Sequence, residues 1–295
     1  MIRIVVLGTS ASMPTKDSWP SCFAIKHGDT LLFDACEGVQ RQMMRHGISY
    51  ASVKAIFLSH LHADHFLGIF GLMQSMNMAG RKEELQVFGP RGTKKLLEQV
   101  LAARELAPAF PVKISDAEAG KVFENPLFQV RAFEVRHYKH ALGYCLEEEN
   151  RRNFDEEKCR KLGIAGRMFG ELQKHGVLTV KGKKIRYDDV SFEKKGKKIV
   201  YTGDTKMFAG LAKEFKDADL VIGDATFSDA EKDMAHEKEH CTAKELAEAV
   251  KKAGAKKLLL THFSNRYDDR RPLLDEAKKE FGESFLAEEG LELMV

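Results

Sequence analysis

The stretch His60-Leu61-His62-Ala63-Asp64-His65 follows shortly after an apolar run, Val53-Lys54-Ala55-Ile56-Phe57-Leu58, which is typical of a buried strand. The chain must turn as it leaves the strand and enters a helix, so side chains this close in sequence can converge on one point. His60 and His62 can bind one metal ion, and Asp64 and His65 can reach a second ion about 3.5–4 Å away, as in two-metal hydrolases. Imidazole and carboxylate ligands suit zinc, with manganese and iron as alternatives.

A two-metal site needs further ligands from distant segments, and three positions are suitable. His262 follows the apolar run 257–260, and Asp204 follows another predicted strand, 198–202. A carboxylate at the end of a strand can bridge two cations. Either His137 or His140 could supply the third imidazole of the first ion, and the residues alone leave that choice open.

The remaining histidines favour structural roles. His46 and His175 each precede a glycine at the end of a helical pattern, and His27 lies in a turn. The segment His236-Glu237-Lys238-Glu239-His240 fits the His-Glu-x-x-His pattern of zinc peptidases, which requires both histidines on one face of a helix. The surrounding residues are polar, and Thr242-Ala243-Lys244-Glu245 predicts a capping box that begins a helix at Thr242. We therefore expect His240 on a loop just before that helix.

Composition and length predict an ordinary globular protein. The chain has 295 residues, of which 43% are hydrophobic, enough for one elaborated domain or two small ones. No apolar run approaches the roughly 20 residues that span a bilayer, and the first apolar run, residues 2–7, is too short for a signal peptide. Five cysteines without paired spacing indicate reduced thiols. These features together predict a cytoplasmic location.

Positive charge is concentrated in one part of the chain. The net charge is only +3, yet residues 150–198 contain fifteen Lys and Arg against seven Asp and Glu, a local balance of +8. Such a region attracts polyanions and gives salt-dependent affinity for phosphates. A solvated, lysine-rich surface insertion is the alternative interpretation.

Apolar runs bounded by Gly, Asp or His alternate with helical patterns along most of the chain. This alternation predicts a layered α/β architecture, with functional groups where strands meet loops. Residues 148–197 break the rhythm with paired arginines, glycine turns and lysine-rich segments. We interpret this stretch as an inserted arm. The predicted strands are 2–7, 30–33, 53–58, 85–88, 127–131, 198–202, 220–222 and 257–260, and the predicted helices are 93–103 and 242–253.

The combined motifs resemble ribonuclease Z, also called tRNase Z, of the metallo-β-lactamase superfamily. The resemblance covers nearly the whole chain in the right order. It rests on His60 to His65, Gly203-Asp204-Thr205 and the following segments: Gly8-Thr9-Ser10-Ala11, Pro14-Thr15-Lys16-Asp17, Phe33 to Gln42, His240-Cys241-Thr242 and Thr261-His262-Phe263-Ser264. It implies a four-layer αββα sandwich over residues 1–295, with 148–197 as an inserted substrate-binding arm.

The resemblance also implies residue roles. Two zinc ions per subunit would be held by His60, His62 and His137 on one side and by Asp64, His65 and His262 on the other, with Asp204 bridging. His137 is preferred to His140 because the family's third histidine stands six residues before the Gly of a Gly-Tyr pair, here Gly143-Tyr144. The implied catalytic residues are Asp64 as ligand and base, His240 as the group that assists the leaving oxygen, and Asp224 as its partner carboxylate.

The implied reaction is hydrolysis of a phosphodiester that removes the 3′ trailer of precursor tRNA. The resemblance further implies a homodimer in which the arm of one subunit serves the active site of the other. Two motifs depart from the family: Ser18 and Trp19 replace Arg and Asn of one loop, and Arg167 replaces Pro in the arm's Gly-Pro motif. The alternatives are a small-molecule or generic phosphodiesterase of the same fold and a non-catalytic RNA-binding protein.

Overall fold

The computed structural model describes residues 1–295, which cluster into two compact units. The first unit comprises Met1–Glu147 and Lys197–Val295, and the second comprises Glu148–Gly196. None of the helices is both long and apolar enough to span a bilayer.

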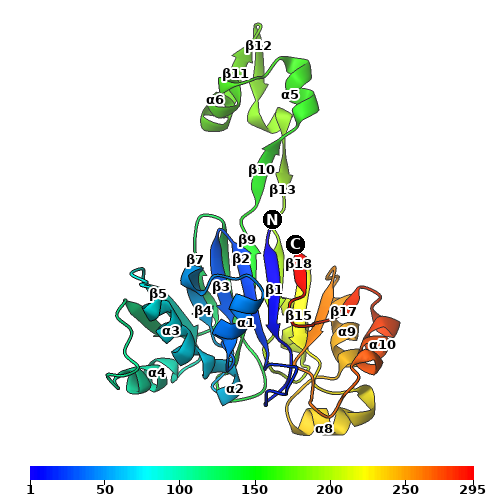
Figure 1. Cartoon of the computed structure of the whole chain (residues 1–295). Helices are drawn as coiled ribbons and strands as arrows, with labels where there is room; N and C mark the ends of the chain where they lie inside the picture. The colour runs from blue at the N-terminus through cyan, green and yellow to red at the C-terminus, as the bar shows by residue number, and fades with distance from the viewer. The chain divides into compact units, whose positions relative to one another are not determined.

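The first sheet of the larger unit has seven strands in the order β18-β1-β2-β3-β4-β5-β6. Strands from β18 to β3 pair antiparallel, and β3 to β6 pair parallel, so the sheet is mixed. The last strand returns to pair with the first one, which ties the C-terminal segment into this sheet (Figure 1). The strands are β1 (Arg3–Gly8), β2 (Cys22–His27), β3 (Asp29–Phe33), β4 (Val53–Phe57), β5 (Leu85–Gly89), β6 (Val112–Asp116) and β18 (Glu292–Met294).

The second sheet also has seven strands, in the order β17-β16-β15-β14-β9-β8-β7. Strands β14 to β17 are parallel, whereas β9 pairs antiparallel with β14 and β7 with β8. The strands are β7 (Gly120–Glu124), β8 (Phe128–Glu134), β9 (Leu142–Glu148), β14 (Lys198–Tyr201), β15 (Leu220–Asp224), β16 (Leu258–Thr261) and β17 (Ser284–Leu286).

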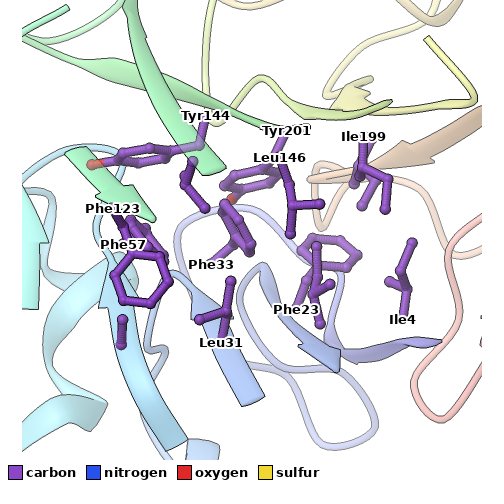
Figure 2. Packing of buried hydrophobic residues seen from close by; sticks show 14 of the residues in the cluster. Ile4, Phe23, Leu31, Phe33, Phe57, Phe123, Tyr144, Leu146, Ile199 and Tyr201 are labelled. Atoms are coloured by element: carbon purple, nitrogen blue, oxygen red, sulfur yellow. The ribbon is translucent and has the colours of Figure 1, made fainter. Parts of the chain in front are cut away.

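The main hydrophobic core lies between the two sheets and is rich in aromatic side chains (Figure 2). Phe33 of the first sheet stacks on Phe57 with ring centroids 5.2 Å apart, and its edge contacts Tyr144 and Tyr201 of the second sheet. Alternate residues of each strand point into this layer because side chains alternate across a strand. Both tyrosine hydroxyls are buried and donate hydrogen bonds, that of Tyr144 to the carbonyl of Leu58.

Helices cover the outer face of each sheet and make the unit a helix–sheet–sheet–helix stack. The first outer core lies under α1, α3 and α4, and the second lies under α7, α9 and α10. Thr242 caps α9 in a capping box with Glu245, as its sequence predicts. The helices of this unit are α1 (Val39–Arg45), α2 (Ala63–Phe66), α3 (Gly68–Met78), α4 (Thr93–Leu101), α7 (Ala209–Glu214), α8 (Lys232–Glu237), α9 (Ala243–Lys252), α10 (Arg271–Glu280), and the 3₁₀ turns η1 (Tyr50–Ser52) and η3 (Asp229–Glu231).

The predicted strands and helices are confirmed, with ends that differ by a few residues. In this unit the sequence did not predict β2, β6, β7, β9, β17, β18 or the helices α7, α8 and α10. Of these, β6, β7 and α8 carry weak apolar patterns. His240 lies beyond the end of α8, so the two histidines of the peptidase-like pattern do not share a helix.

The smaller unit has its own core, formed around Cys159, Ile164, Leu172 and Val190. Asp155 caps α5 by accepting a hydrogen bond from the backbone of Lys158, and α5 ends at a left-handed Gly163. The elements are β10 (Arg151–Phe154), α5 (Glu156–Leu162), α6 (Arg167–His175), β11 (Val177–Val180), β12 (Lys183–Arg186), η2 (Tyr187–Val190) and β13 (Ser191–Lys194). β10 pairs with β13, and β11 with β12.

Candidate active site

The site lies where strands of both sheets end and loops begin. After β4 the chain passes through His60 and His62, and α2 then places Asp64 and His65 in a single helical turn. Asp204 follows β14 by three residues, and His262 follows β16 directly with a positive φ of 60°. Parallel strands bring their carboxyl ends to one edge, which is where ligands bind in sheets of this kind.

Three histidines form the first group. The Nε2 of His60 lies 2.9 Å from the Nδ1 of His62, which lies 3.3 Å from the Nε2 of His137. His60 is fully buried, and His62 is exposed at the mouth of the site. These three nitrogens lie within 4.8 Å of one another, close enough to hold one metal ion.

Asp64, His65 and His262 form the second group, whose ligand atoms also lie within 4.8 Å of one another. The Oδ2 of Asp204 lies between the two groups, 3.0 Å from the Nε2 of His262 and 3.4 Å from that of His65. The same oxygen is 3.7 Å from the Nε2 of His60 and 3.8 Å from that of His137. One carboxylate thus faces both groups.

Hydrogen bonds at the far side of each ring orient the candidate ligands. The Nδ1 of His65 donates to the Oδ2 of Asp34 over 2.8 Å, and that of His262 donates to the hydroxyl of Thr226 over 2.8 Å. The Nδ1 of His60 lies 3.0 Å from the hydroxyl of Ser59, which itself donates to Asp34. With Nδ1 occupied, each ring directs the lone pair of Nε2 into the site.

His137 is held in the same way by the backbone of the loop that carries His240. Its Nδ1 donates to the carbonyl oxygen of Glu239 over 3.2 Å. Glu239 has a positive φ of 59°, and its carboxylate forms an ion pair of 2.7 Å with Lys206. The loop before α9 therefore supports both a candidate ligand and His240.

The electrostatics of the site suit bound cations. Burial lowers the pKa values of His60, His62 and His137, so these imidazoles are neutral and able to coordinate metal. Burial by itself raises the pKa of Asp204, but the neighbouring His262 and His65 outweigh it and hold that pKa well below its ordinary value. The carboxylate is thus ionised at neutral pH.

Unsatisfied buried atoms test whether this donor set fits a metal. Six buried side-chain nitrogens and oxygens in the protein lack a hydrogen-bond partner, and three of them lie here: the Nε2 of His65, the Nε2 of His262 and the Oδ1 of Asp204. Buried polar atoms without partners are costly, so their concentration at one point fits a site that binds cations. Nitrogen and carboxylate oxygen are the ligands of a binuclear site, and the residues fit it.

His240 and Asp224 form a buried pair beside these groups. The Nδ1 of His240 donates to the Oδ2 of Asp224 over 2.7 Å, and the ring of His240 lies 4.6 Å from that of His137. Burial lowers the pKa of His240, but Asp224 outweighs it and the net pKa is raised. Asp224 is itself held by the backbone nitrogens of Thr205 and Thr226, over 3.0 and 2.9 Å.

The structure brings together all the residues that the sequence singles out for this site. His140 is exposed and outside every candidate cluster, with a positive φ of 62°. His46 is the C-cap of α1, and His175 ends α6, in agreement with their predicted structural roles. Sequence reasoning assigned no role to Asp34, Ser59 and Thr226. The signal for Asp34 was a carboxylate at the end of a buried strand.

Comparison with known proteins agrees with this geometry. Residues 29–154 and 175–263 match the model of a protein family described as "Beta-lactamase superfamily domain". A ribonuclease Z of Methanosarcina acetivorans is 41% identical over 300 residues, covering 100% of this chain and 98% of the relative. A ribonuclease Z of Myxococcus xanthus is 40% identical over 287 residues, covering 95% of this chain and 93% of the relative.

Solved structures share the fold at lower identity. Human tRNase Z, short form, has a TM-score of 0.69 and 23% identity, covering 99% of this chain and 98% of that one. The metallo-β-lactamase fold protein YhfI of Bacillus subtilis has a TM-score of 0.71 and 19% identity, with the same coverage. These likenesses establish the fold, and the identity of about 40% over the full length establishes the family. The chain belongs to the ribonuclease Z family of the metallo-β-lactamase superfamily.

Proposed function

We propose that this protein is a zinc-dependent endoribonuclease that hydrolyses a phosphodiester to remove the 3′ trailer of precursor tRNA. The observation that carries the proposal is the placement of Asp204, whose Oδ2 lies within 4 Å of four imidazole nitrogens from both candidate ligand groups. The full-length identity to ribonucleases Z supports the same reaction. A metal-dependent hydrolase requires such a donor set.

We assign two zinc ions per subunit to this site, with Mn²⁺ and Fe²⁺ as the alternatives. One ion would be held by His60, His62 and His137. The other would be held by Asp64, His65 and His262, and Asp204 would contact both ions. Bound metal supplies Lewis-acid chemistry to the phosphodiester and eases the ionisation of water.

Two acid–base roles follow for the chain's own residues. Burial raises the pKa of Asp64, but its interaction with the adjacent imidazole of His65 outweighs burial and the net pKa is lowered. The carboxylate is therefore ionised and able to accept a proton from attacking water. His240 carries its Nδ1 proton toward Asp224 and has a raised pKa, so a second proton on Nε2 is available for the departing ribose 3′-oxygen. Asp224 orients His240 and balances its charge.

The smaller unit, Glu148–Gly196, is proposed to bind the substrate. Its lysine-rich β11–β12 hairpin exposes Lys181, Lys183 and Lys184 around a tight glycine turn. Clustered exposed cations bind phosphates without reading sequence. The proposal includes a homodimer in which one subunit's arm serves the other's active site, and light scattering after size exclusion at two protein concentrations tests it.

A cleavage assay tests the proposed reaction. We expect the protein with zinc to cut a 3′-extended tRNA precursor near the discriminator base and to release the trailer. Hydrolysis of a generic phosphodiester without cleavage of the precursor would favour the small-molecule phosphodiesterase instead. His62→Ala and Asp204→Ala should lose both bound metal and cleavage, and retention of activity in either would contradict the assigned ligands. A non-catalytic RNA-binding protein would bind the precursor without cutting it.

A further inference from the structure

An exposed aromatic side chain stands at the mouth of the site. Tyr138, in the loop between β8 and β9, is 47% exposed although it is large and apolar. Its ring contacts the imidazole of His62 in a tilted arrangement, with ring centroids 4.7 Å apart and planes inclined by 53°. His62 is a candidate metal ligand, so the tyrosine ring is held beside the reacting centre. Its neighbour Lys139 is also exposed.

Successive ring contacts connect His240 to Tyr138 through His137 and His62. Ring centroids are 4.6 Å apart from His240 to His137, 5.0 Å from His137 to His62 and 4.7 Å from His62 to Tyr138. His240 and Tyr138 thus contact different candidate ligand rings, His137 and His62. A substrate strand crossing the site could place one nucleotide near each end of this chain of rings.

The proposed function, on which this inference rests, assigns a nucleotide to the His240 side. His240 protonates a ribose 3′-oxygen, and that oxygen belongs to the nucleotide before the cut. A hollow of about 330 Å³ adjoins His240 there and is lined by Met13, Phe227, Asn265 and Arg266. Tyr138, which contacts His62 rather than His137, is available to the nucleotide after the cut.

We propose that Tyr138 is the stacking platform for the base of the first trailer nucleotide. An aromatic ring with an accessible face binds any nucleobase, because every base has a π face. The platform would position a trailer of any sequence, with Lys139 beside it to meet the backbone phosphate. The contact with His62 would help to hold the ring in place.

Paired substrates separate stacking from other effects. The experiment measures kcat/KM of the zinc-loaded protein on two precursor tRNAs that differ only in the first trailer nucleotide, one normal and one abasic. On the normal substrate, the kcat/KM of Tyr138→Ala should be about tenfold lower than that of the unchanged protein, and the kcat/KM of Tyr138→Phe should be close to it. The unchanged protein should have a kcat/KM about tenfold lower on the abasic substrate than on the normal one. On the abasic substrate, Tyr138→Ala should have the same kcat/KM as the unchanged protein.

Each remaining outcome overturns the proposal. Equal loss by Tyr138→Ala on both substrates would mean that the ring acts through His62, and metal content measured on the same samples would show it. An unchanged kcat/KM of Tyr138→Ala on the normal substrate would exclude a stacking role. If the unchanged protein fails to cut the normal precursor, the proposed function falls, and this inference with it. Leu127→Ala is the matched control, because Leu127 is 43% exposed just before the start of β8, whereas Tyr138 follows its end.

Discussion

At the scale of single residues, Asp34 is the side chain that connects the core to the metal-binding groups. It is fully buried and accepts hydrogen bonds from the Nδ1 of His65, the hydroxyl of Tyr201 and the backbone of Ser59, over 2.8, 2.6 and 2.7 Å. The hydroxyl of Ser59 is a fourth donor to this carboxylate, over 2.8 Å. A buried carboxylate with four donors holds a ligand ring in one orientation and favours one tautomer.

Asp34→Asn should weaken metal binding about 10- to 100-fold, because the amide nitrogen cannot accept the proton of His65. Competition with a chelating dye measures the affinity. Tyr201→Phe is the control, since it removes a different donor to Asp34 and leaves the His65 bond intact. Unchanged affinity in Asp34→Asn would mean that packing alone orients His65.

Asp224→Asn should lower kcat by about 100-fold and leave KM nearly unchanged, because His240 loses the partner that orients and charges it. The test compares precursor tRNA with a p-nitrophenyl phosphodiester, whose leaving group needs no proton. The loss should be much smaller on the activated ester. An equal loss on both substrates, or a loss of bound metal, would show that Asp224 acts through Thr226 and His262 instead.

At the scale of elements, Asp219 links the start of β15 to two neighbouring segments. It is 7% exposed and accepts hydrogen bonds from the Nζ of Lys256 and of Lys197, over 2.8 and 2.9 Å, and from the backbone of Lys198. Burial alone would raise its pKa, but the two lysines and the backbone donor outweigh burial, and the pKa is lowered from its ordinary value of 3.8.

A lowered pKa stabilises the folded protein at pH values above the pKa of the unfolded carboxyl, and this stabilisation is lost as pH falls through the folded pKa. Asp219→Asn should therefore lower the free energy of unfolding by about 1–2 kcal/mol at pH 7. Urea unfolding at pH 7 and at acidic pH measures the difference, which should shrink in acid. The exposed Glu248→Ala on α9 is the control, expected within about 0.5 kcal/mol. A pH-independent difference would exclude an ionic origin.

At the scale of the whole molecule, the two units have separate cores. No buried cluster contains residues of both units, and β9 pairs directly with β14 at Glu147 and Lys198, on either side of the smaller unit. A two-residue Asn-Gly turn can join antiparallel strands at such a place.

Replacing residues 148–197 with that turn should leave a folded protein that hydrolyses a small phosphodiester at an unchanged rate. Its affinity for precursor tRNA should fall at least tenfold, and the salt dependence of binding should weaken as phosphate contacts are lost. Binding titrations at several salt concentrations measure both. Full tRNA affinity in the shortened protein would assign substrate binding to the larger unit.

The sequence alone determined the elements with strong local patterns and the candidate site residues. Period-two and helical patterns predicted strands such as 53–58 and the capped helix at Thr242, and both are confirmed. These features depend on neighbours along the chain, so local reasoning finds them. Local reasoning did not find β6 and β7, because edge strands are only half-buried and contain both polar and apolar residues.

Only the tertiary structure decided how distant groups meet. Two sheets must pack before Asp204 lies within 4 Å of His60, His65, His137 and His262, and the sequence separations between them carry no distance information. The same packing brings Asp34 into hydrogen-bond contact with His65 and Thr226 with His262. It also leaves Tyr138 exposed and in contact with His62. Sequence determined which groups are present, and long-range packing decided which atoms face each other, because contacts between sheets depend on register and layer geometry rather than on local pattern.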